Sequence, residues 1–245
     1  MRGLLPLLTL VAGACGPLPD GPAAPAPEPP RVLADLEPRL AAGEATAWNV
    51  FYQGVQIGRA DLVVDGRAAR TTFRTSRAAR VIAAAHLELA TALEAGRVRG
   101  VRELLTLGRQ TERAEAAIDG ARYTPLGGEP HDVPGGTRLH TLHSALGVLR
   151  AWSAARAPAP GYLWVWSGGS LYRLDVARPV RDEALGVRAL RVDGTVRAPH
   201  LDGAITVELW LAANPDRTPV RLALRTGSHR LAAEVYESTL SLEAR

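Results

Sequence analysis

Residues 204–226, AITVELWLAANPDRTPVRLALRT, decide the fold that we expect for this chain. Two runs rich in aliphatic and β-branched residues, at 204–213 and 219–226, flank the polar segment 214–217. Alternation with a period of two places one side of each run towards a core and the other towards water. Asn, Pro and Asp are typical turn residues. The stretch therefore predicts two antiparallel strands of a β-meander.

The same pattern continues along the chain on both sides of this stretch. Further strands are predicted at residues 47–53, 58–65, 69–76, 98–107, 111–118, 162–166, 170–177, 186–197 and 228–238. Residues 78–96 combine an alanine-rich part with an alternating part, which predicts a short helical piece followed by a strand. Residues 31–42 predict a short helix or an extended lead-in.

One helix is predicted among the strands, at about residues 138–155. Several large apolar residues recur at helical spacing on one face, and they are Leu139, Leu142, Leu146, Leu149 and Trp152. Two prolines beyond residue 157 end the helix, because proline cannot continue the hydrogen-bond ladder. We therefore expect a mainly β fold, in which a curved antiparallel sheet, either an open barrel or sandwich-like, packs on this one main helix.

The N-terminus has the layout of a secretory signal over residues 1–15. A charged start precedes a nine-residue apolar run at 4–12, which is too short to span a bilayer. Small residues then lead to Cys15, the only cysteine of the chain. This ending is similar to a bacterial lipoprotein box, so we expect Cys15 to be lipidated and to anchor the protein in a membrane. The alternative is ordinary cleavage that releases a soluble periplasmic product.

A proline-rich tether is predicted at residues 16–34. Residues 16–30 hold seven prolines, which favour an extended polyproline II conformation. Gly16 follows Cys15 where aspartate would direct retention in the inner membrane by similarity to enterobacterial sorting. We therefore expect a domain at 35–245 on the periplasmic side of a bacterial cell envelope, anchored in the outer membrane.

The positive charge of the chain is spread over the predicted strands. The net charge is +4, and every basic residue is an arginine. Many arginines alternate with apolar residues, as at 188–191 and 221–225, and this spacing is typical of the solvent face of a strand. Nucleic-acid binding requires a clustered basic stripe. We therefore expect no nucleic-acid partner.

Three blocks of the sequence resemble DUF3108, a family of bacterial exported proteins without an assigned activity. They are WNVFYQGVQIGRAD at 48–61, HSALGVLR at 143–150, and LWLAANPDRTPVRL at 209–222 followed by TGS at 226–228. The resemblance implies a curved antiparallel β fold around a helix and brings no reaction with it. The acidic residue that usually precedes the family's Ser-Ala-Leu helix is absent, since His140 and Thr141 stand there.

Few residues are candidates for chemistry. His131, Asp132, His140 and His143 could ligate zinc, but their spacing matches no metalloenzyme motif. Two serines, Ser144 and Ser228, lie outside any Gly-x-Ser-x-Gly nucleophile motif. We therefore expect no catalytic site, no bound metal and no cofactor.

The remaining hypothesis concerns an apolar ligand. Aromatic residues and one arginine could line a groove between the sheet and the helix, and these are Trp164, Trp166, Trp210, Arg150 and Trp152. Core packing is the alternative for the aromatic side chains, and an ion pair is the alternative for Arg150. We expect a non-enzymatic envelope lipoprotein that binds a lipid, a glycolipid or a protein segment. Two other hypotheses are a scaffold subunit of an envelope complex and a hydrolase that acts on envelope polymers.

Overall fold

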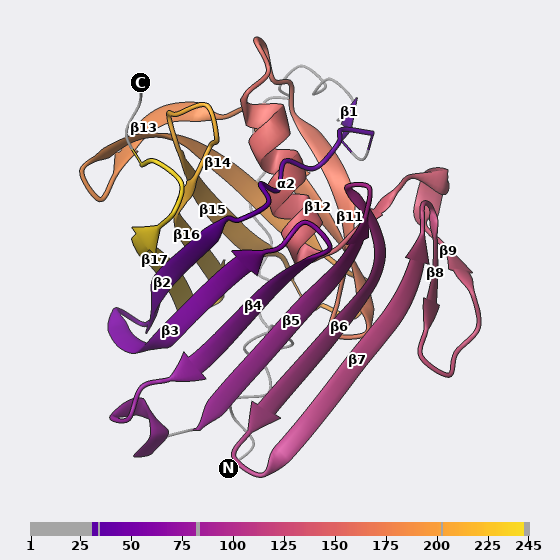
Figure 1. Ribbon diagram of the computed structural model, residues 1–245, viewed down its shortest axis with the longest axis horizontal. Coiled ribbons are helices and arrows are strands. Elements are labelled where there is room, and N and C mark those ends of the chain that lie inside the picture. Colours follow the sequence, from indigo (N-terminus) through magenta and orange to yellow (C-terminus); the bar gives the residue numbers. More distant parts are fainter. Residues whose placement is uncertain (1–30, 34, 82–83, 202, 243–245) are drawn as a thin grey trace, which may run out of the picture.

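The computed structural model describes residues 31–242, except 34, 82–83 and 202 (Figure 1). Within these residues seventeen strands form one sheet, and α2 (Leu142–Ser153) is the only α-helix. The expected mainly β fold, a curved antiparallel sheet on one main helix, is confirmed. The signal segment, Cys15 and the tether up to residue 30 lie outside the described residues. Among those described, no helix is both long and apolar enough to cross a membrane.

The N-terminal half of the sheet is a meander of long strands that ends in two short ones. Its strands are β2 (Ala45–Tyr52), β3 (Val55–Val64), β4 (Ala68–Thr75), β5 (Ala85–Glu94), β6 (Arg97–Leu107), β7 (Gln110–Asp119), β8 (Arg122–Pro125) and β9 (His131–Asp132). A short 3₁₀ turn, η1 (Ala79–Val81), precedes β5, as the alanine-rich part of this region predicts.

The C-terminal half is a second meander. Its strands are β10 (Leu139–His140), β11 (Gly161–Ser167), β12 (Ser170–Val176), β13 (Val180–Ala184), β14 (Val187–Arg197), β15 (Ile205–Ala212), β16 (Pro219–Thr226) and β17 (His229–Ser238). Two short strands, β10 and β1 (Arg31–Val32), pair in parallel with β11. The sequence did not predict β13, which pairs with the first part of β14 while β12 pairs with the last part.

The two meanders join where the first strand of the N-terminal meander, β2, meets the last strand of the C-terminal meander, β17. The last strand, β17, pairs antiparallel with β2, so the N- and C-terminal halves form one continuous sheet. The Thr46 and Ser238 hydroxyls lie 3.1 Å apart across this junction. A pairing between residues so distant in sequence cannot form until both halves are present.

The helix begins at Leu142, four residues later than the sequence predicts. Leu139 is in phase with the leucines of the helix, but it pairs with Trp164 of β11 and is fully buried as part of β10. Thr141 then caps the helix: its hydroxyl accepts a hydrogen bond from the Ser144 backbone N–H, and the Ser144 hydroxyl accepts one from the Thr141 N–H. Leu142 is 41% exposed, so it does not belong to the buried face.

Strand β11, which lies near one edge of the sheet, is enclosed by the other strands of the curved sheet. On one face of β11, Leu163 and Val165 share a core with the helix. On the other face, Trp166 packs with Val101 of β6 and Ala116 of β7. Since side chains alternate along a strand, β11 lies between α2 and the inward face of β6 and β7.

Candidate functional site

The interface between the helix and the sheet is packed with apolar side chains. Ala145, Val148 and Leu149 of α2 meet Leu163 of β11 and Leu209 of β15 in the largest buried cluster. The opposite flank of the helix contacts β3 and β4 through Leu146. The region in which the sequence predicted a ligand groove is therefore occupied by the protein's own core.

A buried ion pair holds the last turn of the helix. The Arg150 guanidinium donates to both carboxylate oxygens of Glu44, at 3.0 and 2.7 Å, and to the Asp216 carbonyl oxygen at 2.9 Å. Arg150 is 1% exposed and Glu44 is 1% exposed. These contacts tie the helix to the segment before β2 and to the turn between β15 and β16. Arg150 therefore forms the ion pair that the sequence analysis gave as the alternative to a ligand contact.

A second buried polar group joins the helix N-terminus to β4 and β5. The two ring nitrogens of His143 lie 2.9 Å from the Thr71 hydroxyl and 2.8 Å from the Thr91 hydroxyl. The Thr91 hydroxyl donates to that of Thr141, the helix cap. Burial lowers the pKa of His143 to about 4, so its ring is neutral at neutral pH.

The residues considered for hydrolysis do not converge in a cleft. His140 Nδ1 lies 3.2 Å from Ser144 Oγ, but both residues are 0% exposed, so a polymer cannot reach this hydroxyl. Asp132 is exposed on β9, where it accepts a hydrogen bond from Arg122 at 2.9 Å. Ser228 lies in the exposed turn between β16 and β17. Within the described part of the chain, no three His, Cys, Asp or Glu residues are placed to hold a metal ion.

The four tryptophans predicted to line a groove lie in three different surroundings. Trp152 packs in the core between the helix and the sheet. Trp164 and Trp166 share a face, as expected, but that face points to β6 and β7 rather than to the helix. Trp210 lies on the outer face of the sheet, where its indole N–H donates to Asp182. Their contact with a ligand remains a prediction, and the structure gives each a packing role.

A row of half-buried apolar side chains crosses five adjacent strands of the N-terminal half. The strand register pairs them in sequence, and the row consists of Trp48, Ala60, Phe73, Leu87 and Leu105. All five are only partly buried. We call this set the apolar row.

The apolar row lies on the inward face of the sheet. Ala60 is two residues from Leu62, which is buried in a cluster that contacts Leu146 of the helix. Figure 1 shows α2 near one end of the sheet, with β4 to β7 running past it towards the other end. Trp48 packs against this same cluster, and from there the row continues the inward face away from the helix. Gly58 helps to shape the row. A Cβ atom at position 58 would lie only 2.7 Å from the Phe73 ring, so glycine leaves room for this ring.

The C-terminal half contributes a matching set on its own inward face. Val207 of β15 pairs with Leu224 of β16, which pairs with Leu231 of β17. All three side chains are half-buried. Val207 is two residues from Leu209, which packs against the helix, so these residues also face inward. The sequence marks each of these positions as part of an alternating strand, but it does not show that they line up.

Comparisons with known proteins support the fold alone. No family model matches the sequence, and no curated protein matches it, so the resemblance to DUF3108 remains a prediction. A β-barrel-like protein with a domain of unknown function, DUF1849, from Brucella abortus is similar with a TM-score of 0.56 and 8% identity, covering 80% of this chain and 96% of that chain.

Two further solved structures show weaker similarity. LprF from Mycobacterium bovis has a TM-score of 0.32 and 13% identity, covering 84% of this chain and 89% of that chain. The lipoprotein LppX from Mycobacterium tuberculosis has a TM-score of 0.27 and 12% identity, covering 84% and 91%.

Proposed function

We propose that this protein is a non-enzymatic lipoprotein of the bacterial cell envelope that binds the acyl part of a lipid or glycolipid. The observation that carries the proposal is the apolar row, which places five half-buried apolar side chains side by side on an inward face. Adjacent strands lie about 4.8 Å apart, so the row extends roughly 19 Å across the sheet. That length suits an extended hydrocarbon chain.

The energetics favour an apolar occupant. Covering apolar surface stabilises a complex by about 25 cal/mol per Å², and an acyl chain gains about 0.8 kcal/mol per buried methylene group. At the helix end of the sheet, the inward apolar side chains are already packed against α2. The ligand site in this proposal is therefore the inward face away from the helix. The five residues that the sequence predicted to line a groove, Arg150, Trp152, Trp164, Trp166 and Trp210, support the fold around this site.

The location in the envelope rests on the sequence. We propose that Cys15 carries the lipid anchor, that the tether holds the domain on the periplasmic side of the outer membrane, and that the chain belongs to the DUF3108 family. The Cys15→Ser variant should move from the membrane fraction to the soluble periplasmic fraction. A variant that stays in the membrane fraction would contradict lipidation at this residue.

Titration with a fluorescent long-chain fatty acid tests the ligand proposal. We expect saturable binding to the full chain, and Phe73→Gln combined with Leu87→Gln should weaken it at least tenfold. Val63→Gln is the matched control, because Val63 is an exposed apolar residue on β3 that points to the opposite face from Leu62 and Val64. Equal affinities of the row variant and the control would contradict binding on the inward face.

A scaffold function through an edge strand has less support. The strand at one edge, β9, has two residues, His131 and Asp132, and both are exposed. The first part of β7, where β8 does not pair, is polar and charged, with Glu112 and Arg113 exposed. Short and charged edges are typical of strands that avoid pairing with another chain.

A further inference from the structure

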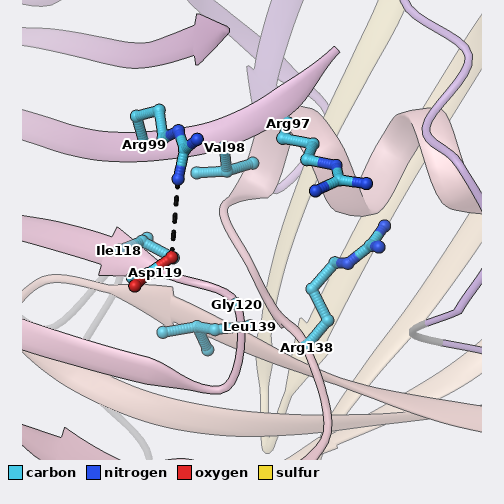
Figure 2. A pocket seen from close by; sticks show the side chains of 8 residues that line it. All are labelled: Arg97, Val98, Arg99, Ile118, Asp119, Gly120, Arg138 and Leu139. Carbon is cyan, nitrogen blue, oxygen red and sulfur yellow. Dashed lines mark hydrogen bonds and ion pairs between the residues drawn. The ribbon is translucent and has the colours of Figure 1, made fainter. Parts of the chain in front are cut away.

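A pocket lined by three arginines opens at the start of β6, at the opposite end of this strand from Leu105 of the apolar row. Its volume is about 110 Å³, and Arg97, Arg99 and Arg138 line it together with Asp119 (Figure 2). Three apolar side chains of the adjoining core, Val98, Ile118 and Leu139, also line the pocket. Neither the proposed acyl site nor the buried polar groups around α2 account for this arrangement.

The arginines differ in how their charge is balanced. Arg99 has two carboxylate partners, Glu94 at 2.7 Å and Asp119 at 3.4 Å. Arg138 contacts Glu37 at 3.3 Å, and that carboxylate is 63% exposed. Arg97 has no ion pair or side-chain hydrogen bond with any residue in the described part of the chain.

The guanidinium groups of Arg97 and Arg138 extend towards each other across the pocket, as Figure 2 shows. The carboxylate that lines the pocket, Asp119, interacts with Arg99 instead. The lining carboxylate therefore contacts neither of these two arginines, whose like charges repel, and a bound anion would offset this repulsion. The arrangement therefore favours a negatively charged ligand between these two side chains.

The backbone holds both arginines in place. The Leu139 N–H donates to the Gly120 carbonyl oxygen at 2.9 Å, which fixes the residue after Arg138 against the turn between β7 and β8. Leu139 is fully buried, so the backbone at Arg138 cannot move without disturbing the core. Arg97 follows a two-residue turn, in which Ala95 and Gly96 both have positive φ, and it pairs with Glu94 in the strand register.

We propose that this pocket binds a phosphate group. Guanidinium groups donate in a planar fork that matches the oxygens of phosphate, and such charge-assisted hydrogen bonds are stronger than neutral ones. A cavity needs roughly 10–15 Å³ to hold one water, so this pocket has room for a phosphate with some of its water but not for a whole lipid. The phosphate is either a free small molecule or the headgroup of a lipid whose tails lie outside the pocket.

Calorimetric titration of the full chain with inorganic phosphate at low salt tests the proposal. The pocket variant combines Arg97→Gln with Arg138→Gln. The control variant combines Arg74→Gln with Arg188→Gln, which removes the same charge from two exposed strand positions. We expect saturable binding, weakened at least tenfold in the pocket variant and changed less than twofold in the control.

Sedimentation with phosphatidylglycerol vesicles separates the two sources of phosphate. Saturable binding of inorganic phosphate that the pocket variant loses would support a site for small phosphate-bearing molecules. Vesicle binding alone, lost in the pocket variant and kept in the control, would assign the site to a lipid headgroup. Binding to neither probe, or equal losses in both variants, would overturn the proposal. Circular dichroism of each variant checks that it remains folded.

Discussion

The two ends of the curled sheet use the same inward-facing strand positions in different ways. Around α2, inward residues such as Leu163 and Leu62 are at most 1% exposed, and buried polar groups bind the helix to the strands. Beyond the helix, inward residues such as Phe73 and Leu87 are only half-buried. The comparison indicates that the helix end supplies most of the stability, while the other end leaves its apolar side chains only partly covered.

The ion pair at the helix end should give the largest effect on stability. Glu44→Gln leaves the buried Arg150 charge without its partner, so we expect the free energy of unfolding to fall by about 3–5 kcal/mol. The control is Glu94→Gln, because Glu94 also lies 2.7 Å from its arginine but is 68% exposed. That variant should lose less than about 1 kcal/mol. Urea unfolding measures both, and equal losses would contradict the role assigned to burial.

The same leucine substitution at both ends tests the comparison directly. Leu163→Ala creates a cavity next to the helix, and we expect a loss of about 2–5 kcal/mol in urea unfolding. Leu87→Ala removes a half-buried side chain of the apolar row, so the loss should be nearer about 1 kcal/mol. A larger loss for Leu87→Ala would show that the far end is a packed core rather than an available surface.

The stability of the helix end should also depend on pH through His143. Its pKa is about 4 in the folded protein and 6.5 in the reference state, so between these values the unfolded protein binds the proton that the folded one excludes. The free energy of unfolding should therefore be constant above pH 6.5 from this group and fall below it, by about 2 kcal/mol at pH 5.

The variant His143→Gln isolates this contribution. Glutamine keeps a polar side chain near the Thr71 and Thr91 hydroxyls but does not titrate. Urea unfolding of both proteins between pH 7 and pH 5 should show a smaller decrease in the variant. The same decrease in both proteins would mean that His143 is not a buried neutral ring.

The sequence predicted local structure better than the arrangement of distant residues. Alternation predicted β15 and β16, and helical spacing predicted α2, because these signals are read within one segment. It could not separate Leu139 from the helix, since a residue in phase with a helix can also pair with a neighbouring strand. Alternation also does not show which face of β15 points inward. The sequence therefore groups Trp210 with Trp152, although the two side chains lie on opposite faces of the sheet.

The candidate sites depend on contacts that no local pattern contains. Glu44 pairs with Arg150, 106 residues away in the sequence. The apolar row exists only because the register of four strand pairings aligns Trp48 with Leu105. The arginine pocket likewise joins the start of β6 to the residues before β10. The ion pair, the apolar row and the arginine pocket therefore depend on strand register and on contacts between segments distant in sequence, rather than on composition.

Photo-crosslinking with a diazirine-bearing long-chain fatty acid tests the central claim most directly. The reagent is bound to the unmodified chain, activated by light, and located by mass spectrometry of peptides. We predict adducts on the inward positions of β2 to β6, at and beside Trp48, Phe73, Leu87 and Leu105. Adducts confined to α2 or to the outer face around Trp210, or no saturable labelling, would contradict the claim that an acyl chain lies along the apolar row.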